Sequence, residues 1–201
     1  MIEILPGVWH WTTVHENWNL PIQSAFFPNV GGGVLIDPRV PAEGLDWFRE
    51  RGEPAHAILT NRHHYRHSGK FRAAFGTIVH CHVAGMHEFK KGEEVEAFEH
   101  GDAIAGIELL EVGVLCPEET AALVPVEGGV LALGDSVIRY GGELRFVSDE
   151  HLGDDPPAIK RGIWSSLARH LGRDFRHLIF AHGDPVLDDG RERLAAFVEE
   201  A

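Results

Sequence analysis

The sequence has only two cysteines and no long hydrophobic run. Cys81 and Cys116 are too few for a disulfide scaffold in a chain of 201 residues, so a reducing compartment is the simpler expectation. No uninterrupted apolar stretch approaches the roughly 20 residues that span a bilayer. The first residues show no basic segment followed by an apolar one, as a signal peptide would have. We therefore expect a cytoplasmic protein without a membrane partner.

Positive charge is scarce as well. Lysine and arginine together number 18 against 31 aspartates and glutamates, which gives a formal net charge of −13. A nucleic-acid backbone or an anionic membrane surface requires a basic face, so neither is expected as a partner. A small-molecule substrate or an anionic ligand is expected instead, and the sequence gives no indication of an oligomeric state.

Hydrophobic residues make up 44% of the chain and fall into short segments among 23 glycines and 11 prolines. Predicted strands are the apolar runs at 2–5, 8–11, 23–27, 34–36, 57–59, 77–80, 104–105, 107–112, 121–124, 130–133 and 177–181. Predicted helices are the periodic segments at 41–51, 70–75, 83–89, 157–171 and from 188 onward.

These elements indicate the fold class. Strands alternating with helices are typical of a layered α/β arrangement. The polar segments 90–100 and 136–155 are predicted to be irregular, and Asp154 or Asp155 is placed to cap the helix that follows. Because no linker separates the two halves, residues 1–201 are predicted to form one domain.

The most unusual stretch is residues 62–67, which contain three histidines and two arginines. It follows the apolar run 57–59 and precedes a helix-like segment, a position where a rigid strand end meets an open loop and where functional groups are common. Five imidazole and guanidinium groups crowded together repel one another when charged. The stretch therefore predicts an anionic or metallic partner nearby.

Polar residues stand at the ends of four predicted strands. They are Asp37, the histidine-rich loop, Gly134-Asp135 and Ala181-His182-Gly183. Their order and spacing resemble the metallo-β-lactamase superfamily over nearly the whole chain. The resemblance implies a four-layered αββα sandwich with a metal site at one edge between the two sheets. It places His182 at the last histidine of the family pattern and Asp37 beside the site, as a support for the ligands.

The histidine loop departs from the family pattern Thr-His-x-His-x-Asp-His-x-Gly. Anchoring the alignment on residues 67–69 places His64 at the second histidine and His67 at the third. Arg62 then stands at the first histidine and Arg66 at the aspartate. We prefer this alignment because it keeps two ligands and the glycine, although it needs one extra residue after Thr60.

The other alignment is anchored on Leu59-Thr60. It places Asn61 at the first histidine and His63 at the second, which makes His63 an alternative ligand. Tyr65 and Arg66 then occupy the aspartate and third-histidine positions. In both alignments the aspartate of the loop is missing.

The middle histidine of the pattern is missing too. The corresponding segment is residues 112–120, and direct alignment places Leu115 at the ligand. A shift of one residue places Cys116 there, and a thiolate is a good zinc ligand. A buried, unreactive cysteine is the alternative interpretation.

Four candidate ligands survive: His64, His67, Asp135 and His182. The resemblance implies that His67, Asp135 and His182 form a set of two histidines and one carboxylate, which suits one zinc or iron ion and leaves positions open. Asp135 is the expected catalytic residue. This set predicts a metal-dependent hydrolase with a reduced site and an unknown substrate.

Arg62 and Arg66 favour a different class of protein. A guanidinium stays charged and cannot ligate a metal, so it repels a dication. Fixed organic charge at these positions can instead bind a carboxylate or phosphate through paired hydrogen bonds. The second hypothesis is therefore a metal-free, non-catalytic binding protein with an arginine-lined anion pocket.

Overall fold

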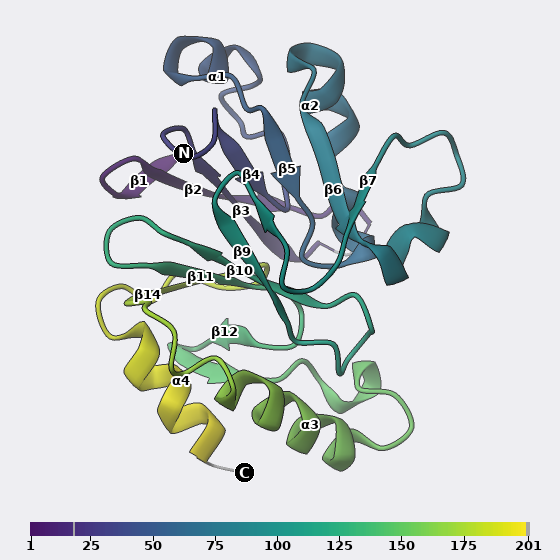
Figure 1. Ribbon diagram of the computed structural model, residues 1–201, viewed down its shortest axis with the longest axis vertical. Coiled ribbons are helices and arrows are strands. Elements are labelled where there is room, and N and C mark those ends of the chain that lie inside the picture. The colour runs from purple at the N-terminus through teal and green to yellow at the C-terminus, as the bar shows by residue number, and fades with distance from the viewer. Residues whose placement is uncertain (18, 200–201) are drawn as a thin grey trace.

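The computed structural model describes residues 1–17 and 19–199. Two sheets lie face to face, and helices cover the outer face of each, so the chain forms four layers (Figure 1). Helices α1 and α2 cover one sheet, and helices α3 and α4 cover the other. The predicted αββα sandwich is thus confirmed.

The first sheet has seven strands in sequential order from β1 to β7. Its strands are β1 (Ile2–Leu5), β2 (Val8–Val14), β3 (Pro21–Phe27), β4 (Val34–Ile36), β5 (His56–Ile58), β6 (Ile78–His82) and β7 (Glu96–Phe98). Its helices are α1 (Asp46–Arg51), α2 (Ser68–Phe75) and the 3₁₀ turns η1 (Arg62–Tyr65) and η2 (Val83–Glu88). The first four strands pair antiparallel and the last four parallel, because helical crossovers connect the latter.

The second sheet has five strands in the order β14-β11-β10-β9-β8. Its strands are β8 (Ala103–Ile104), β9 (Ile107–Glu111), β10 (Thr120–Val124), β11 (Val130–Leu133) and β14 (His177–Phe180). The remaining elements are β12 (Ile138–Tyr140), β13 (Glu143–Arg145), η3 (Asp149–His151), α3 (Pro156–Ala168) and α4 (Gly190–Glu199). Only β11 and β14 pair in parallel within this sheet.

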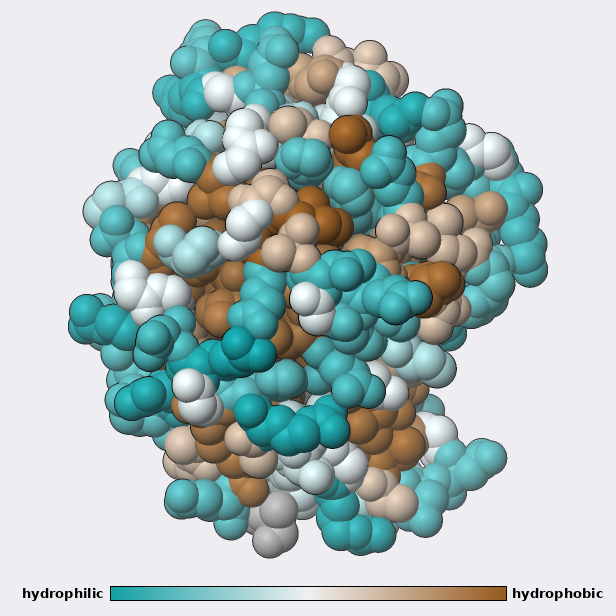
Figure 2. Space-filling view, in the orientation of Figure 1, coloured by the Kyte–Doolittle hydropathy of each residue, from teal (hydrophilic) through white to brown (hydrophobic). Residues whose placement is uncertain are grey.

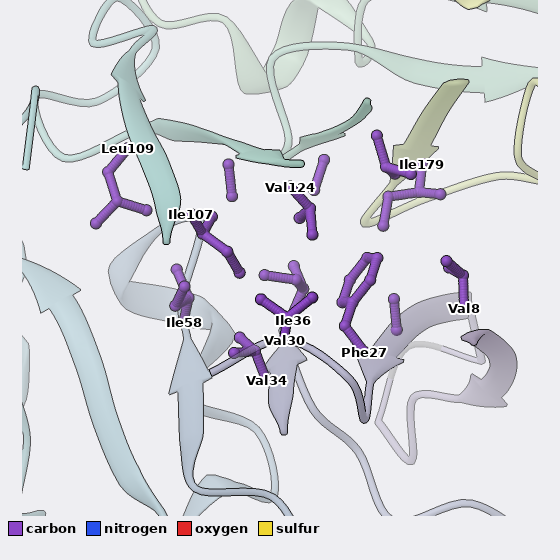
Figure 3. Packing of buried hydrophobic residues seen from close by; sticks show 14 of the residues in the cluster. Val8, Phe27, Val30, Val34, Ile36, Ile58, Ile107, Leu109, Val124 and Ile179 are labelled. Atoms are coloured by element: carbon purple, nitrogen blue, oxygen red, sulfur yellow. The ribbon is translucent and has the colours of Figure 1, made fainter. Parts of the chain in front are cut away.

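The space between the sheets is filled by apolar side chains from both (Figure 3). Phe27 and Ile58 come from the first sheet, and Leu109 and Ile179 from the second, and each is nearly or completely buried. Burying one such side chain contributes about 1.5–3 kcal/mol. The central strands are buried on both faces, which explains why their sequences are continuous apolar runs.

The outer layers have cores of their own. Phe48 of α1 and Phe71 of α2 pack against the first sheet, with their ring centroids 5.1 Å apart. Ile163 of α3 and Leu194 of α4 are fully buried against the second sheet. Each helix is therefore amphipathic, with its apolar side toward a sheet.

Several element boundaries differ from the sequence prediction: β2 extends to Val14, α3 ends at Ala168, and the helix predicted over 83–89 is the 3₁₀ turn η2. The helix predicted over 41–51 begins only at Asp46. Both segments predicted to be irregular contain strands, β7 in one and β12 and β13 in the other. These strands are short, and only one of their nine residues is buried, so they carry little apolar periodicity. The cap of α3 is Asp155, which accepts a hydrogen bond from the Ala158 amide.

The outer surface is largely hydrophilic on the face shown in Figure 2, with hydrophobic residues visible in patches. The large hydrophobic residues that are exposed are Ile2, Val14, Leu20, Val83 and Tyr140. Across residues 1–17 and 19–199, none of the helices has the length and apolar character needed to cross a membrane.

Candidate metal centre

The polar residues at four strand ends meet at one edge of the sandwich because of strand direction. β4 and β5 run parallel and in register, which brings Asp37 next to Thr60. β11 and β14 are also parallel and in register, which brings the segments carrying Asp135 and His182 together. Parallel strands end at the same edge, so residues far apart in the sequence become neighbours.

Asp37 holds His64 in a fixed orientation. The Asp37 carboxylate accepts hydrogen bonds from the Thr60 amide at 2.8 Å and from the Thr60 hydroxyl at 2.6 Å. The same carboxylate lies 2.8 Å from Nδ1 of His64. All three residues are buried. A carboxylate on one imidazole nitrogen turns the other nitrogen, here Nε2, toward the site.

Nε2 of His64 faces Asp135, and so does Nε2 of His182. Their distances to Oδ1 of Asp135 are 3.2 and 3.3 Å. Oδ1 of Asp135 is buried between these two imidazole rings. Three donor atoms from His64, Asp135 and His182 thus lie within 4.8 Å of one another.

These separations fit metal ligands. Two atoms that are each about 2.0–2.1 Å from one tetrahedral zinc ion lie about 3.3 Å apart. A buried carboxylate needs positive charge beside it, and the site that His64 and His182 provide for it has the nitrogen donors that a metal ion would use in its place. The group therefore has the donor types and the spacing to hold one metal ion.

Asn61 connects the other oxygen of Asp135 to Glu119. The Asn61 amide nitrogen donates to Oδ2 of Asp135 at 3.0 Å and lies 3.4 Å from Oε2 of Glu119. Glu119 is fully buried, and its Oε1 accepts a hydrogen bond from the Ser136 amide at 2.8 Å. A Cβ atom at Gly134 would lie only 2.6 Å from Oε1 of Glu119, so glycine is needed there.

The charges of the site favour a cation at His64. Burial alone would lower the pKa of His64, but the carboxylates of Asp37 and Asp135 outweigh it and raise this pKa to about 9. Burial would raise the pKa of Asp135, but the charges of His64 and His182 hold it well below its usual range. Burial and the charge of Asp135 raise the pKa of Glu119. The field of the carboxylates would favour a metal ion in the same way.

Solved structures of other proteins share this architecture. A metallo-beta-lactamase family protein from Thermus thermophilus matches with a TM-score of 0.68 at 17% identity, over 98% of this chain and 80% of that one. A metallo beta lactamase from Erythrobacter litoralis matches with a TM-score of 0.69 at 16% identity, over 100% and 92%. A protein solved in a di-iron-bound form matches with a TM-score of 0.70 at 20% identity, over 92% and 98%.

The chain has the metallo-β-lactamase fold. Neither a protein-family model nor a curated protein matches the sequence. The likeness therefore lies in the fold, at sequence identities of 20% or less for the three structures named above.

Of the four ligands predicted from the metallo-β-lactamase pattern, the fold gathers three: His64, Asp135 and His182. His67 lies outside this group. Its Nδ1 accepts a hydrogen bond from the Val40 amide at 3.0 Å, and its Nε2 lies 3.7 Å from a carboxylate oxygen of Glu16. His67 is the residue directly before α2, and its side chain makes no capping hydrogen bond to that helix.

The alternative ligands His63 and Cys116 are not part of the group either. His63 is exposed, and its backbone amide donates to the Asn61 side chain at 2.9 Å. The Cys116 thiol lies 3.6 Å from Oε2 of Glu119. Burial and the neighbouring glutamates raise the pKa of this thiol far above its usual range, so it is unreactive in this environment.

The two arginines predicted to bind an anion are engaged elsewhere. Arg62 forms an ion pair with the buried carboxylate of Glu118. Arg66 donates to the carbonyl oxygens of Gln23 at 2.8 Å and Asp37 at 2.9 Å. Both guanidinium groups thus support the loop instead of lining an open pocket.

The sequence analysis missed Asn61 and Glu119 as site residues. Asn61 corresponds to the first histidine in the alignment anchored on Leu59-Thr60, and its side chain does reach Asp135. Glu119 directly precedes β10, which runs antiparallel to β11, so it lies at the sheet edge that carries Asp135. A glutamate immediately before an apolar strand was the available signal.

Proposed function

We propose that this protein is a metal-dependent hydrolase of the metallo-β-lactamase superfamily that binds one divalent ion through His64, Asp135 and His182. The observation that carries the proposal is the convergence of three donor atoms: buried Oδ1 of Asp135 lies 3.2 Å from Nε2 of His64 and 3.3 Å from Nε2 of His182, and all three lie within 4.8 Å of one another. The fold shared with proteins of that superfamily supports the same class.

A bound ion polarises a carbonyl or phosphoryl group and acidifies a water molecule. Residues of the chain orient the ligands of this ion. Asp37 fixes the orientation of His64, and Asn61 holds Oδ2 of Asp135 so that Oδ1 faces the histidines. Asp135 and His182 remain 27% and 29% exposed, which gives a small-molecule substrate access to the site.

We propose zinc or iron as the metal. Two histidines and one carboxylate with open positions suit both ions. One of the proteins with a similar fold was solved in a di-iron-bound form. In the described part of this chain only one group of three donors gathers, which supports one ion.

Metal analysis of protein purified without chelator tests the proposal. We expect about one equivalent of zinc or iron, and its loss in His182→Ala and His64→Ala. His67→Ala is the matched control, because both ring nitrogens of His67 face other residues, and it should keep the metal. Less than about a tenth of an equivalent in the unsubstituted protein contradicts the proposal.

A panel of lactam, lactone, thioester and phosphoester substrates then tests hydrolysis. Turnover of at least one class should disappear with chelator and return with added metal. The arrangement of Arg62 and Arg66 does not favour the metal-free binding protein considered above, because both guanidinium groups are already engaged. A small-molecule substrate and a cytoplasmic location remain part of the proposal.

A further inference from the structure

Basic side chains gather around the segment that follows Asp37, in a chain whose net charge is −13. Arg39 follows Asp37 by two residues, and its backbone amide donates to the Ser24 hydroxyl, which itself donates to the Asp37 carbonyl. His67 accepts the amide hydrogen of Val40, the residue after Arg39, and Arg66 donates to the Asp37 carbonyl two residues before it, so the three basic residues share one segment. Such a cluster requires an anion to neutralise it.

The anion in this structure is the carboxylate of Glu16. Arg39 is only 4% exposed, and Glu16 is its ion-pair partner. Nε of Arg39 is buried and makes no hydrogen bond with any described residue. A guanidinium offers five donors in a planar fork, so this buried cation has donor capacity left for a carboxylate.

His67 adds a second donor on the same side. Because its Nδ1 accepts the Val40 amide hydrogen, the neutral ring carries its proton on Nε2. Burial and the charge of Arg39 lower the pKa of His67, which favours this neutral form. Nε2 lies 3.7 Å from Oε1 of Glu16, the same oxygen that pairs with Arg39. Arg39 and His67 therefore both contact the same carboxylate oxygen.

Glu16 is the exposed member of the ion pair with Arg39. Its side chain is 63% exposed, and it belongs to the connection between β2 and β3. The strand that follows this connection begins beside the metal group, because Nδ1 of His182 lies 3.2 Å from the carbonyl oxygen of Pro21, the first residue of β3. An exposed glutamate on a surface connection exchanges with solvent easily, whereas Arg39 is buried and His67 is anchored to the Val40 amide.

We propose that Arg39 and His67 form a subsite for a carboxylate of the substrate, which Glu16 occupies in this structure and which the substrate takes over by displacing it. The role of the subsite in catalysis rests on the proposed function, whereas its binding of a carboxylate does not. We assign a carboxylate because the group now seated there is one, and because one guanidinium and one neutral imidazole match a single negative charge.

Binding of acetate to the full-length protein tests the subsite, followed by NMR of the His67 ring nitrogens. Glu16→Gln removes the internal competitor and should bind acetate at least about tenfold more tightly than the unsubstituted protein. Glu50→Gln, which replaces another exposed glutamate, is the matched control and should leave the affinity unchanged. In the Glu16→Gln background, Arg39→Gln should abolish binding and Arg39→Lys should weaken it.

The outcomes separate this proposal from the proposed function. Repeating the titration after chelator treatment should give the same affinity, because the subsite contains no metal ligand. If neither metal nor hydrolysis is found, the proposed function fails but the acetate-binding result still holds. Equal acetate affinity with and without Glu16→Gln, a result that does not depend on how Arg39 variants fold, overturns the proposal. Tighter binding of inorganic phosphate than of acetate overturns the assignment to a carboxylate.

Discussion

The carboxylate of Asp37 lies 2.8 Å from Nδ1 of His64, and this contact leaves Nε2 of His64 facing Oδ1 of Asp135 at 3.2 Å. Asp37→Asn keeps the size of the side chain but removes its charge. We expect metal affinity to fall about 10- to 100-fold, because the supporting carboxylate orients the ligand and increases its basicity.

Chelator competition on the Asp37→Asn protein measures this loss. Asp154→Asn, at an exposed position outside the site, is the control and should bind metal as the unsubstituted protein does. Thermal unfolding should be recorded in parallel, so that a folding defect is distinguished from loss of affinity. Unchanged affinity in a folded Asp37→Asn protein would mean that Asp37 does not support the ligand.

Metal should stabilise the fold, because the three donors come from three separate segments of the chain. Zinc at about 100 times its dissociation constant is expected to add about 2.7 kcal/mol to the free energy of unfolding. Urea unfolding of chelator-treated protein with and without zinc measures the increase. The same addition to His182→Ala should have little effect, and an equal increase in that variant would place the bound zinc elsewhere.

Gly134 should be intolerant of even one additional methyl group. Its added Cβ would lie 2.6 Å from Oε1 of Glu119 and 2.9 Å from the Thr60 hydroxyl, and both residues are buried. Gly134→Ala is expected to cost about 1–3 kcal/mol of stability and to weaken metal binding. Gly172→Ala, where nothing lies within 4 Å of the added atom, is the matched control. Similar urea midpoints for both variants would contradict the prediction.

Stability should decrease when the pH falls from about 6.5 to 4. Burial lowers the pKa of His10 to about 4, and Nε2 of its ring has no hydrogen bond in the described structure. Between these two pKa values the unfolded chain binds a proton that the folded chain does not, so acid favours unfolding. The shift corresponds to about 3 kcal/mol when fully expressed.

Urea unfolding at several pH values measures this dependence, and His10→Gln should reduce its slope by removing one titrating group. His80 and His100, whose pKa values burial also lowers to about 4, retain the rest of the slope. The absolute stability of the variant does not affect the comparison, since only the slope against pH is used. A variant with the same slope as the unsubstituted protein would show that His10 remains neutral in both states or is charged in both.

The sequence was sufficient to predict the fold class and most of the strands. Segments such as 34–36 and 130–133 are buried on both sides, so they are continuous apolar runs that any pattern analysis detects. β7 was missed because it is held by main-chain pairing with β6 at the sheet edge, and only Phe98 of its three residues is buried. Main-chain hydrogen bonds do not require particular side chains, so such a strand has no recognisable side-chain pattern.

The site was predictable only in part. Asp135 and His182 each lie two residues after the end of an apolar strand, so their place at the sheet edge follows from strand direction. His64 and His67, in contrast, lie in a loop that turns through η1, and Arg66 there has a φ of 45°. A turn of this kind decides which side chains point inward, and no periodicity in the sequence encodes it.

The amino-acid sequence by itself determined which donor types exist and which strand ends carry them, because local hydrophobicity sets the strands and their order. Only the tertiary structure decided that His64, and not His67, faces Asp135, that Glu119 enters from β10, and that Glu16 covers Arg39. The reason is physical. Contacts between residues far apart in the chain depend on how the sheets pair and how the loops turn, and both are set by packing of the whole chain.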